Sequence, residues 1–174
     1  MKLVFPNLSH KAVARDFIVE FSADDSSSNG DGSLAKYLQS ASYDAWLQKT
    51  RNDLDLANIQ PGRVPAITYF AVREEDDKII GMLNVRLALN DFLRTEGGHI
   101  AYCVRPSERG NGYAKQMLRK AIDLCTILGI SHPILCCNKE NIASAKVIQS
   151  CGGKLDAEFY SETFGAVIQR YLIQ

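Results

Sequence analysis

The pattern of hydrophobic and polar positions divides the chain into segments with helical periodicity and segments with strand character. Apolar residues at helical spacing predict four helices: one after Ser9, one over residues 34–48, one over residues 112–128, and one that ends at residues 152–153. Stretches rich in β-branched and aromatic residues predict six strands, over residues 66–73, 79–87, 99–104, 134–137, 154–160 and 166–172. This order predicts an α+β fold with a mixed sheet flanked by helices, in a single domain.

The amino-terminal third is predicted to be helical with one polar interruption. Ser9 is the expected N-cap of the first helix, and its predicted core residues are Val13, Phe17, Ile18 and Phe21. Residues 22–33 contain almost no apolar side chains, so we expect a mobile loop there.

The second predicted helix is expected to break around Ser42, and Trp46 within it is expected to be a packing anchor. Acidic residues 74–77 read as the tip of a hairpin between two strands. Gly81, inside the second of these strands, predicts a bulge or a close backbone approach.

Residues 104–118 form the most informative stretch of the sequence. An apolar strand runs into a proline, a glycine-containing turn and then an amphipathic helix. Gly110 and Gly112 would let the backbone approach a ligand closely, and the first amides of the helix have no intrahelical acceptor. The positive end of the helix dipole adds to these donors, so the turn predicts an anion site, with phosphate as the preferred anion.

Composition excludes several classes of function. The chain has 20 basic and 20 acidic residues and a net charge of zero, which argues against nucleic acid as a partner. No apolar run reaches the roughly 18 residues of a membrane span, and the first residues lack the features of a signal peptide, so we expect a cytoplasmic protein without membrane contact. The five cysteines are expected to be buried free thiols, and with three histidines they suggest no metal site.

Two other phosphate-binding turns do not fit. A P-loop requires G-x-x-x-x-G-K-[ST], which residues 112–115 do not provide, and a dinucleotide fingerprint requires a third glycine and an acidic residue about 20 positions later.

Residues 109–114, Arg-Gly-Asn-Gly-Tyr-Ala, instead satisfy the acyl-CoA signature of the GCN5-related N-acetyltransferases (GNAT): Arg or Gln, two variable residues, Gly, one variable residue, then Gly or Ala. The later segment from Asn141 through a short helix to residues 152–153 is similar to a second family motif. Residues 97–109 resemble a bacterial subgroup of predicted acetyltransferases. The resemblance covers about residues 66–153, and it implies a central, mostly antiparallel mixed sheet and acetyl-CoA as the acyl donor.

The resemblance also implies which residues hold acetyl-CoA. Their main-chain groups would bind its pantetheine arm and its diphosphate. These predicted cofactor-binding residues are Cys103, Val104, Arg109, Gly110, Asn111, Gly112, Tyr113, Ala114 and Asn141. Arg105 follows Val104 directly. It could add a local positive charge to the anion site, or it could equally be a solvated cation at the end of a strand. Asn141, or alternatively Asn138, is expected to cap the helix whose predicted core residues are Ile142, Ala145, Val147 and Ile148.

The catalytic groups are less clearly marked. Many relatives carry a tyrosine seven residues after the capping asparagine, where this chain has Ile148. Tyr102 is a candidate proton donor with a packing role as its alternative, and Ser144 is a candidate replacement acid. Glu96 and His99 are candidate bases, and a structural role for His99 is an equal alternative.

Three hypotheses follow. The first is an N-acetyltransferase that moves acetyl from acetyl-CoA to a primary amine of a small molecule, peptide or protein. The second is a non-catalytic acyl-CoA-binding module, suggested by Ile148 and by the lack of an obvious base. The third is a structural or nucleotide-binding α/β protein with a fortuitous glycine turn. The acceptor and the oligomeric state stay open, and a homodimer is one state that we consider.

Overall fold

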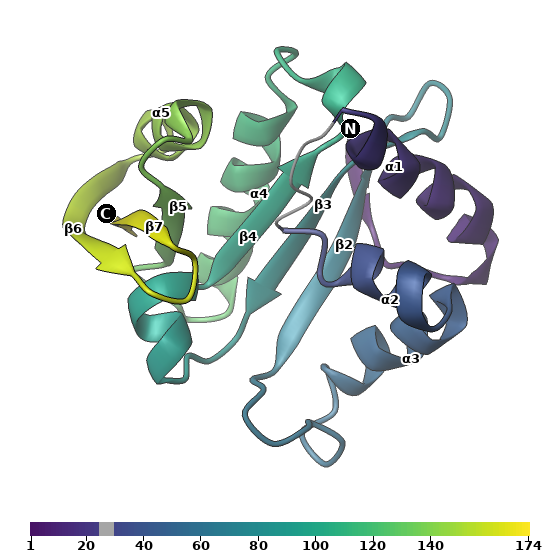
Figure 1. Ribbon diagram of the computed structural model, residues 1–174, viewed down its shortest axis with the longest axis horizontal. Helices are drawn as coiled ribbons and strands as arrows, with labels where there is room; N and C mark the ends of the chain where they lie inside the picture. Colours follow the sequence, from purple (N-terminus) through teal and green to yellow (C-terminus); the bar gives the residue numbers. More distant parts are fainter. Residues whose placement is uncertain (25–29) are drawn as a thin grey trace.

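Helices pack on both faces of a four-stranded sheet, and a second, three-stranded sheet stands beside it (Figure 1). The computed structural model describes residues 1–24 and 30–174. The amino-terminal elements are β1 (Lys2–Val4), α1 (Lys11–Ala23), α2 (Leu34–Ser40) and α3 (Tyr43–Asn52). The three helices bury large side chains, among them Phe17 and Trp46, against one face of the first sheet.

The first sheet is antiparallel throughout, with the order β1-β2-β3-β4. Its other strands are β2 (Ala66–Val72), β3 (Ile79–Arg86) and β4 (Ile100–Val104). Gly81 pairs with Val104, and a Cβ at this glycine would lie 2.6 Å from the Cys103 carbonyl oxygen. The expected close backbone approach at Gly81 is therefore confirmed.

The remaining elements form the other face and the second sheet. They are α4 (Tyr113–Ile127), β5 (Ile134–Asn138), α5 (Ile142–Ser150), β6 (Gly153–Ser161) and β7 (Ala166–Ile173). Helix α4 buries Met117, Leu118, Ala121 and Cys125. Ala114 and Ile122, the other apolar residues at helical spacing in this segment, are half-buried. The second sheet has the order β5-β7-β6 and is also antiparallel.

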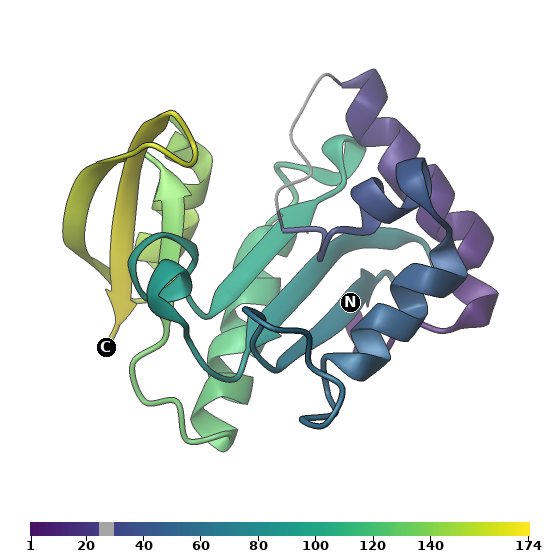
Figure 2. The same cartoon turned by 60° about the horizontal axis from the view of Figure 1, so that its bottom comes forward.

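The two sheets touch at the starts of β4 and β5 and then diverge (Figure 2). The His99 amide donates to the Ile134 carbonyl oxygen at 2.7 Å, and the Ile134 amide donates to His99 Nδ1 at 3.0 Å. Gly98 has a φ of +67°, and a Cβ there would collide with the Ile134 main chain. A glycine is therefore required where the two backbones meet, and beyond this point the free edge of β4 faces an opening.

The predicted α+β fold class with flanking helices is confirmed. The expected single mixed sheet needs a correction, because the described strands form two sheets whose pairs are all antiparallel, and β4 and β5 touch only at their starts. The expected break at Ser42 is also confirmed, because its side chain caps α3 by accepting from the Ala45 amide at 3.1 Å. Trp46 is fully buried, as expected for a packing anchor. Helix α4 ends at Ile127, close to the predicted end at residue 128, and Gly129 follows with a φ of +78°.

Some local predictions were wrong. Strand β1 was not predicted, and Asn7 rather than Ser9 caps the first helical turn, a 3₁₀ segment that leads into α1. Val13 is 40% exposed, and Ala14 takes its place in the core. Ile142 is also exposed, because it occupies the first position of α5 on the side away from the sheet.

The expectation of a mobile loop over residues 22–33 needs a partial correction. Residues 22–24 belong to the end of α1 and the turn after it, and residues 25–29 lie outside the described part of the chain. Gly30 lies directly on the main chain of Tyr102, where a Cβ would collide. Asp31 is buried and accepts hydrogen bonds from the Ser33 and Ala35 amides, both at 2.8 Å. Residues 30–33 are therefore packed on the first sheet, with Gly30 against β4 and Gly32 beside Thr68 of β2.

None of the helices in residues 1–24 and 30–174 is both long and apolar enough to cross a membrane.

Candidate active site

A cleft of about 760 Å³ opens between the end of β4, the glycine turn, the start of α4 and the start of α5. The structure brings most of the predicted cofactor-binding residues to this cleft. Its lining includes Cys103, Val104, Arg109, Gly110, Gly112, Tyr113, Ala114 and Asn141. Asn111 is not part of the lining, because its side-chain amide donates to the Glu108 carbonyl oxygen at 3.3 Å and holds the turn.

The glycine turn is shaped for close approach by a ligand. Gly110 and Gly112 have φ values of +80° and +77°, and a Cβ at either would point into open space. The first helical hydrogen bond after the turn runs from the Gln116 amide to the Gly112 carbonyl oxygen. The preceding amides at the start of α4 have no intrahelical acceptor, so they are available to a diphosphate together with the positive end of the helix dipole.

Helix α1 and its C-cap residue hold this turn through three acidic residues spaced four apart. Asp16 accepts from Arg105 at 2.6 Å, and Glu20 Oε1 accepts from the Ser107 amide at the same distance. Asp24 accepts from Arg109 at 2.9 Å. Because residues four apart share one face of a helix, a single face of α1 aligns the segment that leads into α4.

Arg105 is only 3% exposed, and its guanidinium lies 5.7 Å from the centre of the Phe17 ring. The interpretation as a solvated cation was therefore wrong, since the residue joins β4 to α1. The spacing of Asp16, Glu20 and Asp24 is the signal that could have revealed this contact in the sequence.

The second support comes from Glu108, a buried carboxylate on the other side of the turn. It pairs with Arg73 at 3.0 Å and with Lys78 at 2.7 Å, which both lie next to the β2–β3 hairpin. Two cations on one carboxylate offset its desolvation, and they fix the turn to the first sheet beside the β2–β3 hairpin.

Tyr102 and Ser144 meet inside the cleft, with 3.3 Å between their hydroxyl oxygens. Burial raises the pKa of Tyr102 to about 12, against a smaller lowering effect of the Ser144 hydrogen bond. Ser144 stands in the first turn of α5 because Asn141 Oδ1 accepts from its amide at 3.0 Å. Of the two candidate caps, Asn141 is the correct one.

Glu96 and His99 are not among the residues that line the cleft. Glu96 Oε2 accepts from Ser161 Oγ at 2.5 Å, which joins the helical turn η2 (Leu93–Gly97) to the second sheet. Burial, together with the charges of Arg86 and Arg94, lowers the pKa of His99, and its Nδ1 is occupied by the Ile134 amide. A neutral imidazole bonded in this way carries its proton on Nε2. Its lone pair on Nδ1 already accepts the hydrogen bond from the Ile134 amide, so it is not available to take a proton from a substrate.

Ile148 is 1% exposed and packs directly against Gly153. The position at which many relatives place a tyrosine is therefore part of the core between α5 and β6. Cys103 is buried on β4, and burial raises the pKa of its thiol well above the ordinary value, so it is a neutral packing group at the edge of the cleft.

Two diverging sheets, an open glycine turn at a helix start and a cleft along the free edge of β4 define the acyl-CoA-binding class of acyltransferases. The family profile described as "Acetyltransferase (GNAT) domain" matches residues 14–154, and the chain belongs to this family. It is accordingly an acyltransferase that uses acetyl-CoA as its donor. No curated protein sequence matches the chain.

Solved structures with low sequence identity share the fold. A ribosomal-protein-S5-alanine acetyltransferase from Vibrio fischeri has a TM-score of 0.71 at 14% identity, over 98% of this chain and 90% of that one. The ribosomal L7/L12 alpha-N-protein acetyltransferase RimL in complex with coenzyme A gives 0.70 at 18%, over 98% and 91%. A mutant of the spermidine N-acetyltransferase SpeG from Vibrio cholerae gives 0.65 at 17%, over 99% and 94%.

Proposed function

We propose that the chain is an N-acetyltransferase that transfers the acetyl group of acetyl-CoA to a primary amine of a small molecule, peptide or protein. The observation that carries this proposal is the cleft, which joins the free edge of β4, the open glycine turn and the Tyr102–Ser144 pair. Arg109 and the first amides of α4 suit the diphosphate, and the β4 main chain near Cys103 and Val104 suits the pantetheine arm.

The reaction requires a neutral amine and a stabilised leaving group. Acetyl-CoA supplies a thioester whose carbonyl carbon accepts the amine lone pair, and the carbon–sulfur bond then breaks. In our proposal Tyr102 donates its proton to the departing sulfur and Ser144 holds the phenol in place. A thiolate with a pKa of about 8.5 needs only modest help to leave, so a single weak acid is sufficient.

Removal of the amine proton is assigned to groups in the segment just before β4. Glu96 stays the proposed base, because Ser161 occupies only one of its carboxylate oxygens. For His99 the hydrogen bond from Ile134 supports a role as a donor or as a structural pin rather than as a base.

The proposal extends to the cellular setting. We infer one acetyltransferase domain over residues 1–174 in the cytoplasm, where the five free cysteines fit a reducing compartment. Balanced charge supports an amine acceptor rather than nucleic acid as the partner.

The test is incubation of the purified chain with acetyl-CoA and a panel of primary amines, followed by mass spectrometry of the amines. We expect an N-acetylated product from at least one amine and calorimetric binding of acetyl-CoA but not of ATP or NAD. Binding without transfer to any amine would favour the non-catalytic module, whose supporting observation is the core position of Ile148. Binding of ATP or NAD instead would favour the nucleotide-binding hypothesis.

A further inference from the structure

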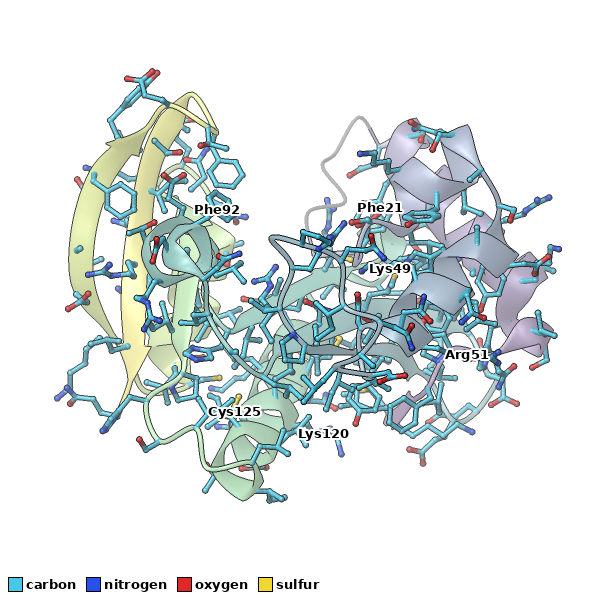
Figure 3. The ribbon with its side chains drawn as sticks, turned by 90° about the horizontal axis from the view of Figure 1, so that it is seen from below. Phe21, Lys49, Arg51, Phe92, Lys120 and Cys125 are labelled. Atoms are coloured by element: carbon cyan, nitrogen blue, oxygen red, sulfur yellow. The ribbon has the colours of Figure 1, made fainter. Side chains whose placement is uncertain are left out.

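A second cavity, of about 300 Å³, lies on the face of the first sheet that α1, α2 and α3 cover. Strand β3 contributes Asn84 and Arg86 to its lining, and α3 contributes Lys49 and Asp53. Asn84 and Arg86 alternate with Leu83 and Val85, so they share the sheet face of Met82, which packs among the helices. Phe92, beside η2, lines the cavity from the side of the second sheet, opposite Lys49 (Figure 3).

Strand register places this cavity next to the acyl-CoA cleft. Met82 pairs with Cys103, which lines the cleft, and Asn84 pairs with Ala101. The two sites are therefore separated by two residues along β4, which is about 7 Å in an antiparallel strand. A group bound beside Asn84 would lie within reach of a thioester held along β4.

The cavity carries a surplus of positive charge. Its charged lining residues are Lys49, Asp53, Arg63 and Arg86. Lys49 and Asp53 neutralise each other in a largely buried ion pair at 2.7 Å. Two guanidinium groups are left, and within residues 1–24 and 30–174 neither of them forms a salt bridge with a carboxylate.

One nitrogen of the Arg86 guanidinium, Nη1, is hydrogen-bonded to the protein. Nη1 donates to the Gly97 and Gly98 carbonyl oxygens at 2.7 and 2.9 Å, which fixes the plane of the group. Nε and Nη2 have no hydrogen-bond partner among the described residues. This edge of a guanidinium binds both oxygens of a carboxylate in a bidentate pair. Burial lowers the pKa of Arg86, as expected for a cation without an anionic partner.

Asn84 adds a neutral polar group two residues away. Its amide nitrogen donates to Thr68 Oγ1 at 3.0 Å, so its Oδ1 remains as an acceptor, and no described residue donates to it. Oδ1 is suited to an amine N–H. Along β3, the hydrogen-bond acceptor for an amine, Asn84 Oδ1, therefore lies nearest the cleft. The carboxylate-binding guanidinium of Arg86 lies beyond it.

We propose that this cavity holds the acetyl acceptor and selects a small amine that carries a carboxylate, with Arg86 as the carboxylate-binding residue. The inference rests on the proposed N-acetyltransferase function and specifies its substrate class. A polyamine would place further positive charge beside Arg63 and Arg86, so it is disfavoured as an acceptor. A carboxylate fits the Nε–Nη2 edge of Arg86 better than a phosphate, which has three oxygens to satisfy.

The test compares each of the common amino acids except proline, aspartate and glutamate with its own α-amide, which keeps the primary amine and removes the negative charge of the α-carboxylate. Spermidine and O-phosphoethanolamine are the polyamine and phosphate arms, and N-acetylated product is measured by mass spectrometry. For at least one amino acid we expect kcat/KM about 10- to 100-fold above that of its amide, the range for a charge-assisted hydrogen-bond pair. Equal or better turnover of amides, spermidine or O-phosphoethanolamine would overturn the inference.

Variants then assign the effect to Arg86. Arg86→Gln should bring the ratio of amino acid to amide close to one while the Kd of acetyl-CoA stays unchanged, and Arg86→Lys should retain part of the preference. Arg51→Gln removes an exposed cation on α3 that is not in the cavity lining (Figure 3), and it should leave the ratio unaltered. A preference that survives in Arg86→Gln would overturn the assignment.

The two proposals fail in different ways. If the wild-type chain does not bind acetyl-CoA, the proposed function is wrong and the inference fails with it. If it binds acetyl-CoA and acetylates only amines without a carboxylate, the function stands and the inference is wrong. The comparison within the wild-type chain needs no variant, so a folding defect in Arg86→Gln does not prevent this decision.

Discussion

The hydroxyl oxygens of Tyr102 and Ser144 lie 3.3 Å apart in the cleft between β4 and α5. Tyr102 comes from β4 and Ser144 from the first turn of α5, and both line the cleft. In this chain the phenol therefore enters the cleft from β4, whereas the usual tyrosine position on α5 is filled by Ile148.

Removal of the phenol should slow the chemical step. We expect Tyr102→Phe to lower kcat about 10- to 100-fold, the lower range for a general acid, with KM for acetyl-CoA unchanged. Steady-state kinetics with the best amine checks this, and Tyr160→Phe, which changes an exposed residue on β6, serves as the control. Unchanged kcat in Tyr102→Phe would remove the phenol from the mechanism.

The same assignment has a pH consequence. A general acid must be protonated, so its activity is lost as pH rises through its pKa, and the pKa of Tyr102 is raised to about 12. We expect kcat of the wild-type chain to show no loss from this group between about pH 7 and 10, the upper limit being the ordinary tyrosine pKa. A fall in kcat near pH 10 that is absent in Tyr102→Phe would contradict the raised pKa.

The glycine turn is tested by a pair of isosteric variants. Gly112→Asp and Gly112→Asn both add a Cβ at a φ of +77°, and both residue types tolerate this conformation better than most. Only Asp adds negative charge against the diphosphate, so it should abolish calorimetric binding of acetyl-CoA or bind at least about 10-fold more weakly than Asn. Circular dichroism should show both variants folded. Equal affinity of the two would place the diphosphate elsewhere.

Ile148 gives a prediction on stability. Truncation of this fully buried side chain in Ile148→Ala should lower the free energy of unfolding by about 2–5 kcal/mol in urea titrations. The control on the same helix is Ile142→Ala, where the side chain is exposed and the change should stay within about 0.5 kcal/mol. Normal stability with altered turnover in Ile148→Ala would mean that the residue belongs to the cleft.

The contact between α1 and the glycine turn predicts a loss of stability in acid. Burial raises the pKa of Glu20, but hydrogen bonds from Ser107 and the Arg105 charge outweigh it and hold the pKa below its ordinary value. A lowered folded pKa means that this stabilisation is present above about pH 4.3, the unfolded value, and is lost as pH falls through the folded pKa.

We expect Glu20→Gln to cost about 1 kcal/mol of unfolding free energy at pH 7, with solvent screening allowed for, and the difference to shrink below about pH 4. Asp16→Asn, at a mostly exposed side chain, should cost less than about 0.5 kcal/mol. Urea titrations at several pH values measure both. A cost for Glu20→Gln that does not depend on pH would show that packing, not charge, maintains the contact.

Local sequence signals predicted most of the fold. Periodicity located the strands and helices that are long enough to show it, and Ser42 and Gly129 marked helix boundaries because capping depends on neighbouring residues only. Strand β1 was not predicted, because its three residues are too few to show a strand periodicity. Val13 and Ala14 differ in burial through the rotation of α1 on the sheet, which tertiary packing sets.

The difference between local sequence signals and long-range packing also applies to the site. Residues 109–114 predict the proposed donor site, because the main-chain geometry that binds an anion depends on residues that are adjacent in the sequence. The burial of Arg105 and Arg86 is not marked by their neighbours in the sequence, because it depends on Asp16 and Gly97, which lie far along the chain or beyond a turn. For Arg105 the one signal is distant, the spacing of the acidic residues on α1. The acceptor side is built in this long-range way, so it became visible only in the folded chain.

The most direct test of the donor site is hydrogen–deuterium exchange of the chain with and without saturating acetyl-CoA. The first amides of α4 have no intrahelical acceptor, so they should exchange quickly in the free chain and become protected when a diphosphate binds them. We expect protection over residues 110–115 and along β4 at residues 102–104, with no change over residues 154–160 of β6. Unchanged exchange over residues 110–115, at an acetyl-CoA concentration shown by calorimetry to saturate the chain, would contradict the site.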